Sequence, residues 1–282
     1  MVRRYELTDE EWEKLQVLLP SGRMGRPRED DRRVLNGIVW KIRSGAAWRD
    51  VPARYGSWQS IYTRFRRWAL DGTFTRMLQA LQAEADARGD IDWLVAVDST
   101  IVRAHQHAAG AKKGGQAPGE PSDHALGRSR GGLTSKIHLA CDGRGRPLAV
   151  LVTGGNVNDC TRMQQVLQTI RVPRLGRGRP RTRPDHVVAD KGYSSRAIRS
   201  YLRRRGISHT IPERADQIAG RARRGSKGGR PPVFDAQIYK RRNVVERCFN
   251  QLKQFRALAT CYDKTATSYT AVVTIAALLL WL

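Results

Sequence analysis

Two aspartates occupy positions at which a buried strand would reach the surface. Asp98 follows the apolar residues 94–97, and Asp190 follows a second short strand pattern at residues 186–189. In α/β sheets, the residue after such a strand commonly contacts a ligand. A single aspartate there more often makes a turn or a cap. Two of them in one basic chain make a functional role as plausible as a structural one.

A third carboxylate, Glu246, lies in a segment whose periodicity predicts one long helix over residues 237–255. At about 100° per residue, one face of this helix carries the polar side chains Tyr239, Arg242, Glu246 and Lys253. The other face is apolar and predicts packing on the core. An ion pair between Arg242 and Glu246 on a solvated face explains the same spacing equally well.

Three gathered carboxylates suit metal-dependent chemistry on a phosphodiester. Such a bond is protected by its own negative charge, which two metal ions about 4 Å apart can offset on the attacking and leaving oxygens. Mg²⁺ prefers hard oxygen ligands, which Asp and Glu supply. Without metal, the same carboxylates would repel one another.

The charge balance of the chain favours a polyanionic partner. Among 282 residues there are 51 Lys and Arg against 26 Asp and Glu, a formal net charge of +25. Nucleic acid is the commonest cellular polyanion, although a ribosomal or membrane-surface protein could share this balance. The charge alone therefore favours nucleic-acid binding without settling it.

The cysteines and the apolar segments indicate a reduced, non-membrane protein. Four cysteines without zinc-site spacing predict free thiols in or near the core. The longest apolar run, residues 275–282, is far shorter than the roughly 20 residues of a membrane span. We expect it to be a core-packing C-terminal helix, and we expect a soluble cytoplasmic protein.

Residues 1–88 predict a helical domain. Thr8 and Glu11 form a capping-box pattern, a second helix begins near Asp31 and can end at Gly45, and a third begins after Ser57. A tight connector at residues 48–52 and a basic third helix predict a helix-turn-helix-like DNA-binding domain. Its candidate DNA contacts are Arg64, Arg66 and Arg67. An ordinary bundle with solvated arginines is the alternative.

Residues 89–282 predict an α/β domain. The pattern is three strands, a helix, a strand, a helix, a strand and then helices, with basic or Gly-rich loops at residues 108–132, 175–183 and 213–233. Strands covered by helices form an α/β layer architecture, and this order is compatible with several such folds.

The segments that hold the three carboxylates resemble the DDE transposases of the insertion-sequence-four and insertion-sequence-five types. The matching segments are Val-Asp-Ser-Thr at 97–100, Ala-Asp-Lys-Gly-Tyr at 189–193, and the ungapped spacing Tyr239, Arg242, Glu246, Lys253. Thr-Gly-Gly-Asn-Val-Asn-Asp at 153–159 and N-terminal stretches at 7–12, 25–27, 48–52 and 55–58 also resemble that family. The likeness covers nearly the whole chain.

This resemblance implies a ribonuclease-H-like catalytic core, with a mixed sheet and flanking helices, after the helical domain. It implies that Asp98, Asp190 and Glu246 hold two Mg²⁺ ions, which Mn²⁺ could replace. It also implies DNA cleavage at insertion-sequence ends and strand transfer into target DNA, with double-stranded DNA as partner. We expect a homodimer on DNA, in the bacterial cytoplasm and associated with the nucleoid. Further DNA contacts are expected from Tyr239, Arg242, Lys253 and Lys191.

Several weaker signals remain open. His105 and His107 could ligate metal, lie near DNA or be structural, and Mg²⁺ disfavours imidazole. Asp142, in a predicted turn, and Asp159, at a predicted helix start, are rival carboxylates. Two other functions are compatible with this chain. A domesticated, non-catalytic DNA-binding protein would need no carboxylate triad, and a ribonuclease-H-like nuclease would cut without joining.

Overall fold

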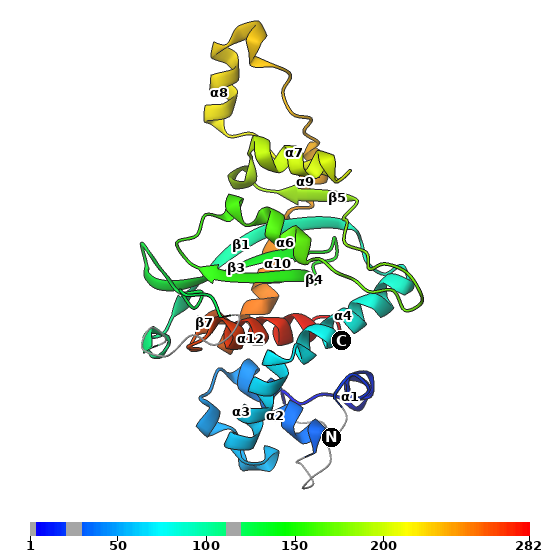
Figure 1. The fold of residues 1–282 in the computed structure, drawn as a ribbon, viewed down its shortest axis with the longest axis vertical. Helices are drawn as coiled ribbons and strands as arrows, with labels where there is room; N and C mark the ends of the chain where they lie inside the picture. The colour runs from blue at the N-terminus through cyan, green and yellow to red at the C-terminus, as the bar shows by residue number, and fades with distance from the viewer. Residues whose placement is uncertain (1–3, 21–29, 111–119) are drawn as a thin grey trace.

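The computed structural model describes residues 4–20, 30–110 and 120–282. The Gly-Arg-Pro tripeptide at 25–27 and part of the loop predicted at 108–132 lie outside these ranges. The described chain has a helical N-terminal region below a mixed sheet, and helices cover both faces of that sheet (Figure 1).

The N-terminal helices begin and end where capping residues predict. They are α1 (Asp9–Gln16), α2 (Asp31–Ser44), α3 (Trp58–Leu70) and α4 (Thr73–Ala87). Thr8 and Glu11 form the predicted capping box, and Ser57 caps α3. Gly45 ends α2 with φ 73°, a left-handed conformation that favours glycine. The predicted helical character of this region is confirmed.

The connection between α2 and α3 is longer than a helix-turn-helix turn. It runs from Gly45 to Ser57 and contains two short 3₁₀ helices, η1 (Trp48–Asp50) and η2 (Ala53–Tyr55). The aromatic ring of Trp48 packs 4.9 Å from the ring of Phe65, which fixes this connector on α3. The predicted tight turn at residues 48–52 corresponds to η1, between the predicted helix ends at Gly45 and Ser57, and the helix-turn-helix-like role of this region stays a prediction.

Seven strands of the described residues form one mixed sheet. They are β1 (Leu94–Ala104), β2 (Gly127–Ser129), β3 (Gly132–Cys141), β4 (Pro147–Gly154), β5 (His186–Ala189), β6 (Ser208–Thr210) and β7 (Thr260–Cys261). The main strands lie in the order β4-β3-β1-β5-β6. β3 is antiparallel to both neighbours, whereas β5 is parallel to β1 and β6. This is the strand order of a ribonuclease-H-like sheet.

β1 extends far beyond the apolar run that predicted it. Its pairing with β3 continues from Ala96 opposite Cys141 to Arg103 opposite Thr134. Asp98 therefore lies within the strand, and its predicted position at a strand end was wrong. The backbone hydrogen bonds to β3 maintain the strand through its polar residues, whatever the hydropathy of their side chains.

The predicted helix over residues 237–255 is divided into two. α9 (Ala236–Lys240) ends before two turn residues, and α10 (Asn243–Lys253) follows. The backbone N–H groups of Arg241 and Arg242 bond to carbonyls three residues back, which interrupts the α-helical pattern. Tyr239 and Glu246 thus belong to different helices.

The segment 213–233 is not the loop that its composition predicted. It contains α8 (Ala215–Arg223) and the 3₁₀ turn η6 (Gly225–Gly228), which project beyond α7 (Arg196–Arg204) at one end of the molecule (Figure 1). None of the residues of α8 is buried, so the helix has no apolar stripe from which periodicity could predict it.

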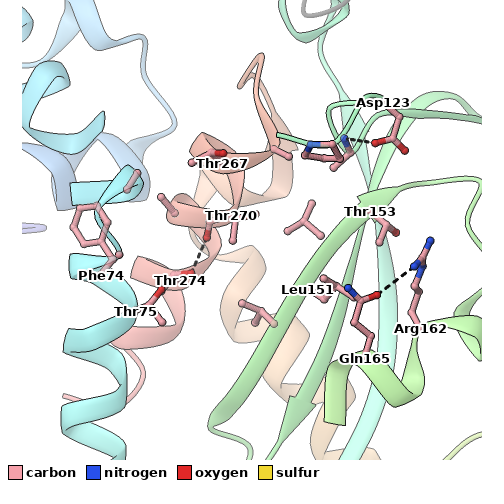
Figure 2. A pocket seen from close by; sticks show the side chains of 18 of the residues that line it. Phe74, Thr75, Asp123, Leu151, Thr153, Arg162, Gln165, Thr267, Thr270 and Thr274 are labelled. Carbon is pink, nitrogen blue, oxygen red and sulfur yellow. Dashed lines mark hydrogen bonds between the residues drawn. The ribbon is translucent and has the colours of Figure 1, made fainter. Parts of the chain in front are cut away.

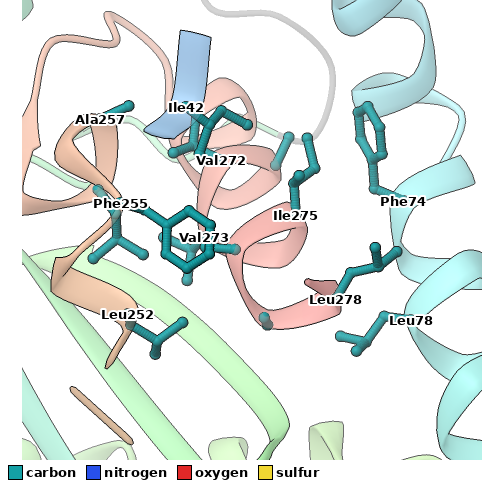
Figure 3. Close-up of a cluster of buried hydrophobic side chains, with 14 of the residues drawn as sticks. Ile42, Phe74, Leu78, Leu252, Phe255, Ala257, Val272, Val273, Ile275 and Leu278 are labelled. Carbon is teal, nitrogen blue, oxygen red and sulfur yellow. The ribbon is translucent and has the colours of Figure 1, made fainter. Parts of the chain in front are cut away.

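Helices cover the two faces of the sheet differently. α6 (Met163–Thr169) and α7 pack on one face. On the other face, α10, α11 (Arg256–Ala259) and α12 (Ala266–Leu278) share one hydrophobic cluster with the N-terminal helices. Figure 3 shows α12 between these groups, with Val272 and Val273 beside Phe255, and Leu278 beside Leu78 of α4. The predicted core-packing role of the C-terminal helix is confirmed.

This shared cluster crosses the expected domain boundary between residues 88 and 89. The boundary stays a prediction, and experiments on the chain are best made with all of it. The four cysteines are free, and three are buried, as predicted. Within residues 4–20, 30–110 and 120–282, we find no helix of the length and apolarity that a membrane crossing requires.

Candidate active site

The sheet places Asp98 and Asp190 side by side. In the parallel pair of β1 and β5, Val97 lies opposite Ala189, and each aspartate is the next residue along its strand. Side chains alternate between faces, so both aspartates lie on the face that α10 covers. Asp190 caps the short turn η5 (Lys191–Tyr193), and its Oδ1 accepts a hydrogen bond from the Gly192 N–H at 2.8 Å.

Arg242 joins the third carboxylate to the first. Its Nη2 lies 2.5 Å from Oδ2 of Asp98 and 3.1 Å from Oε1 of Glu246. Because both oxygens contact the same nitrogen, Oδ2 of Asp98 and Oε1 of Glu246 can be no farther apart than the sum of these two distances. Glu246, in the first turn of α10, therefore faces Asp98, although 148 positions separate them in the sequence.

The electrostatics of Asp98 reflect this crowding. Burial raises the pKa of its carboxyl from 3.8 to about 6, and the negative charges of Asp190 and Glu246 act in the same direction. The hydrogen bond from the Ser99 N–H and the charge of Arg242 lower this pKa, but they do not compensate fully. A buried acid whose ionised form is disfavoured by two neighbouring carboxylates is typical of a functional site.

Three further predicted residues lie on or near this face. Lys253, at the end of α10, donates from Nζ to Oγ1 of Thr100 on β1 at 2.7 Å. Tyr239 lies on α9, with its ring 5.3 Å from that of Phe234. Lys191 is exposed in the turn directly after Asp190. The structure thus gathers Asp98, Asp190, Arg242, Glu246 and Lys253, and leaves Tyr239 on the preceding helix.

These residues fit a site for hard divalent cations. All three carboxylates offer oxygen donors, and the cationic guanidinium of Arg242 already lies between two of them. In the described parts of the chain, no three His, Cys, Asp or Glu side chains stand at mutual metal-binding distance. Arg242 contacts Asp98 and Glu246 through Nη2, and its buried Nε lacks a hydrogen-bond partner.

The rival carboxylates serve structural roles. Asp142 is fully buried in a turn, where its Oδ1 accepts from the N–H groups of Arg144 and Arg146. Asp159 lies 2.8 Å from Nζ of Lys136. The helical turn at this point is capped by its neighbour Asn158. The turn thus accounts for the position of Asp142, whereas Oδ1 of Asp159 has an ion-pair partner but no hydrogen-bond partner.

The histidines after β1 are engaged locally. Nδ1 of His105 accepts a hydrogen bond from the His107 N–H at 3.2 Å and caps α5 (Gln106–Ala109). The His105 ring also packs 4.6 Å from the ring of Tyr262. These contacts favour the structural role among the three that the sequence left open.

The three arginines of α3 differ. Arg64 forms an ion pair with Asp31 of α2, and its guanidinium lies 5.3 Å from the centre of the Trp68 ring. Arg66 and Arg67 are exposed. Arg64 therefore holds α3 on α2, while the other two are available to a partner.

Sequence inspection gave no role to Tyr193 or Gly192, although both lie in the motif that contains Asp190. Tyr193 is 2% exposed, and burial raises the pKa of its hydroxyl above the usual range, with a smaller contribution from the charge of Asp98. A Cβ at position 192 would lie 2.9 Å from Oδ1 of Asp190, so glycine there leaves room for the carboxylate. The motif at residues 189–193, which contains Asp190, was the sequence signal from which Gly192 and Tyr193 could have been found.

A separate cavity of about 510 Å³ lies between α4, α12 and β4 (Figure 2). Its labelled lining residues include Phe74, Leu151, Arg162 and Thr270. None of the three candidate carboxylates lines it. We therefore do not assign the chemistry to this cavity.

Comparison with known families covers almost the whole chain. Residues 90–281 match the family described as the transposase DDE domain. This chain belongs to that family. Residues 7–78 also match a family described as a putative transposase of the IS4/5 family. The resemblance that the sequence motifs indicated is thus confirmed, and a DDE transposase domain is the domain of an enzyme that cuts and joins DNA and normally uses a divalent metal.

Three individual relatives are similar to parts of this chain, and two of them are named putative transposases. The uncharacterized protein y4sN of Sinorhizobium fredii is 44% identical over 116 residues, which are 40% of this chain and 89% of that protein. A putative transposase for insertion sequence element IS402 of Burkholderia cepacia is 39% identical over 132 residues, 47% of this chain and 55% of that protein. A putative transposase for insertion sequence element IS6501 of Brucella ovis is 30% identical over 150 residues, 53% of this chain and 99% of that protein.

Among solved structures, the chain matches a pre-cleavage Mos1 transpososome over 92% of its length and 80% of that chain. The identity is 14% and the TM-score is 0.26. So low a score carries no argument, and the fold assignment rests on the strand order of the sheet.

Proposed function

We propose that this chain is a DNA transposase whose catalytic residues are Asp98, Asp190 and Glu246. The observation that carries the proposal is the contact of one guanidinium, that of Arg242, with both Asp98 and Glu246. It brings a carboxylate from a strand and one from a helix together beside Asp190. Family membership supplies the reaction class, and the geometry supports the choice of residues.

The three carboxylates would hold two Mg²⁺ ions, which Mn²⁺ could replace. When bound, the ions activate the attacking oxygen and stabilise the leaving oxygen of a phosphodiester. The chain's own groups prepare the site for this reaction. Arg242 keeps Asp98 and Glu246 together before metal binds, and the Gly192 N–H orients Asp190. Lys253, held at Thr100, offers a cation to a nearby backbone phosphate.

The proposed substrates are the terminal inverted repeats of an insertion sequence and a target DNA. A net charge of +25 supports strong, salt-dependent attachment to the DNA backbone. We further propose that the chain acts as a homodimer on DNA, associated with the bacterial nucleoid. The exposed Arg66 and Arg67 of α3 are the candidate contacts of the N-terminal helices.

A labelled end oligonucleotide tests this function. The full chain should nick the oligonucleotide and join it to a second duplex in Mg²⁺ or Mn²⁺, and excess chelator should stop both reactions. Cutting without joining would favour a ribonuclease-H-like nuclease. Binding without either reaction would favour a domesticated DNA-binding protein. Either result would overturn the proposal.

A further inference from the structure

A basic hollow lies at the β6 edge of the sheet, between α7 and the segment that returns from α8 to α9. It consists of two adjoining cavities of about 860 Å³ and 330 Å³. Both are lined by Arg199, Arg203, Arg230 and Pro232. In Figure 1 this region is at the end of the molecule where α7 and α8 project past β5. None of the residues of the proposed active site lines it.

The charges of this hollow are predominantly positive. Its lining includes six arginines, namely Arg196, Arg199, Arg203, Arg221, Arg224 and Arg230. Two carboxylates accompany them, and both have partners. Glu213 pairs with Arg221 at 2.7 Å, and Asp235 accepts from the Gln237 N–H at the start of α9. Arg203 and Arg230 are exposed, and in the described part of the chain neither lies within 4.0 Å of a carboxylate oxygen.

Arg199 contributes a buried positive charge to the lining of the hollow. This residue is 8% exposed, and its Nη2 donates to the Ile211 carbonyl at 2.8 Å and to Oγ of Ser194 at 3.1 Å. Its other terminal nitrogen, Nη1, is buried without a hydrogen-bond partner. Burial also lowers the pKa of this guanidinium, because a desolvated charge without a full set of partners is unfavourable. An anion in the hollow would offset that cost.

The chemistry of the hollow fits phosphodiesters. Guanidinium groups match phosphate geometry, and arginines that contact phosphate position DNA without reading its sequence. Two cavities that share a wall of arginines are larger than one small ion requires. They are better matched to consecutive phosphates of a nucleic-acid backbone.

Strand β5 relates one lining residue of this hollow, His186, to the candidate active site. His186 lines the larger cavity, and Asp190 is four residues farther along the same strand direction. Four residues of strand span about 13 Å, and an even spacing keeps both side chains on one face. Base pairs of duplex DNA follow one another at about 3.4 Å, so this distance corresponds to roughly four base pairs.

We propose that the basic hollow binds backbone phosphates of the DNA being processed, roughly four base pairs or more from the bond that is cut at the site of Asp98, Asp190 and Glu246. This inference rests on the proposed function, because it takes the position of the cut from those carboxylates. It assigns to α7 and the return segment the task of fixing the duplex beside the reacting bond.

The test compares two full-length variants that each lose two positive charges. Arg203→Ala with Arg230→Ala removes the exposed cations of the hollow. Arg88→Ala with Arg171→Ala removes two exposed arginines elsewhere and serves as the matched control. Binding to an end duplex is measured over a range of salt concentrations in chelator, so no cleavage interferes. The hollow variant should lose about two units of slope in log K against log salt, and the control should lose none.

A second measurement locates the contact. Single backbone linkages of the duplex are replaced, one at a time, by neutral methylphosphonates. With the unaltered chain and the control, affinity should fall several-fold at linkages roughly four or more base pairs from the cut. With the hollow variant, the same linkages should cause no further loss, because the two changes remove one interaction.

The outcomes separate this inference from the proposed function. Two results would contradict the hollow as a DNA contact. One is an equal salt slope for both variants, and the other is that the arginine substitutions and the methylphosphonates interact only at linkages nearer the cut. A rise in melting temperature of the unaltered chain with inorganic phosphate alone, as large as the rise with duplex, would indicate a small-anion site and also overturn it. Failure to cut DNA in metal would refute the proposed function while leaving the measured binding intact.

Discussion

Nη2 of Arg242 lies 2.5 Å from Oδ2 of Asp98 and so joins the start of α10 to the middle of β1. The side chains are 21% and 14% exposed, so solvent screens this pair only partly. The cation compensates part of the repulsion among three carboxylates in the metal-free protein. Metal would take over that compensation, so binding of metal and release of Arg242 from Asp98 should be coupled.

Replacing Arg242 by glutamine tests this coupling. Without the cation, the metal-free variant should melt lower than the unaltered chain by roughly 3 °C, a loss on the order of 1 kcal/mol. Its rise in melting temperature with Mn²⁺ should be larger, because metal then relieves more repulsion. Arg247→Gln, an exposed arginine of the same helix, is the control and should change neither value. A Mn²⁺ effect equal to that of the unaltered chain would contradict the coupling.

The raised pKa of Asp98 predicts how stability depends on pH. Because the pKa is about 6 in the folded chain against an ordinary 3.8, the folded chain holds a proton that the unfolded chain has released between these values. The contribution of the Asp98 carboxyl to the stability of the folded chain is complete below about pH 3.8 and is lost as the pH rises through about 6. Asp98→Asn stays neutral at every pH.

In chelator at about pH 8, the Asp98→Asn variant should therefore be more stable than the unaltered chain, by roughly 2–3 kcal/mol. The difference should shrink toward zero near about pH 4. Denaturant melts at both pH values measure it, with the exposed Asp50→Asn as control. A constant difference between the two pH values would show that Asp98 ionises as it does in water.

Gly192→Ala should impair the site without unfolding the chain. Its Cβ would meet the carboxylate of Asp190 at 2.9 Å, and that flexible group can move aside at little energetic cost. The displaced oxygen is a proposed metal ligand, so DNA cleavage should fall at least tenfold, as 1 Å shifts in reacting groups do. Gly220→Ala, which meets nothing within 4 Å, is the matched control. Normal cleavage by the Gly192 variant would place Asp190 outside the site.

Lys253→Ala should weaken activity less than loss of a carboxylate. The change removes the hydrogen bond to Thr100 and a candidate phosphate contact, but no metal ligand. Cleavage at saturating metal should fall by roughly tenfold, the effect of one lost phosphate contact of about 1.4 kcal/mol. Lys240→Ala, an exposed lysine on α9, is the control. A loss as complete as that of a metal ligand would require a different role for Lys253.

The candidate site could be predicted from the sequence because its residues are carried by motifs, whereas local periodicity misjudged the elements around them. Asp98 was placed at a strand end because the apolar run stops at Val97, yet β3 continues to pair with β1 through Arg103. Such pairing depends on a partner strand about 40 residues away, as Asp98 opposite Leu139 shows. Hydropathy in a short window contains no information about it.

The interruption between α9 and α10 has a similar origin. Arg241 pairs with Asp92, just before β1, and Arg242 pairs with Asp98 within β1. A helical wheel places Tyr239, Arg242 and Glu246 on one face, but it contains no information about ion pairs with distant residues where the helix is interrupted. Arg64 illustrates the same limit, since only the fold reveals its ion pair with Asp31.

Glu246→Gln tests the central claim most directly. The change keeps the shape of the side chain but removes the charge that would hold metal, and Glu13→Gln, an exposed helical glutamate, is the matched control. The measurement is cleavage and joining of a labelled end oligonucleotide in excess Mg²⁺ or Mn²⁺. The variant should bind the DNA with unchanged affinity while nicking and joining both collapse, because one pair of metal ions serves both steps. Undiminished joining by the Glu246→Gln chain would contradict the assignment of Asp98, Asp190 and Glu246 as the catalytic residues.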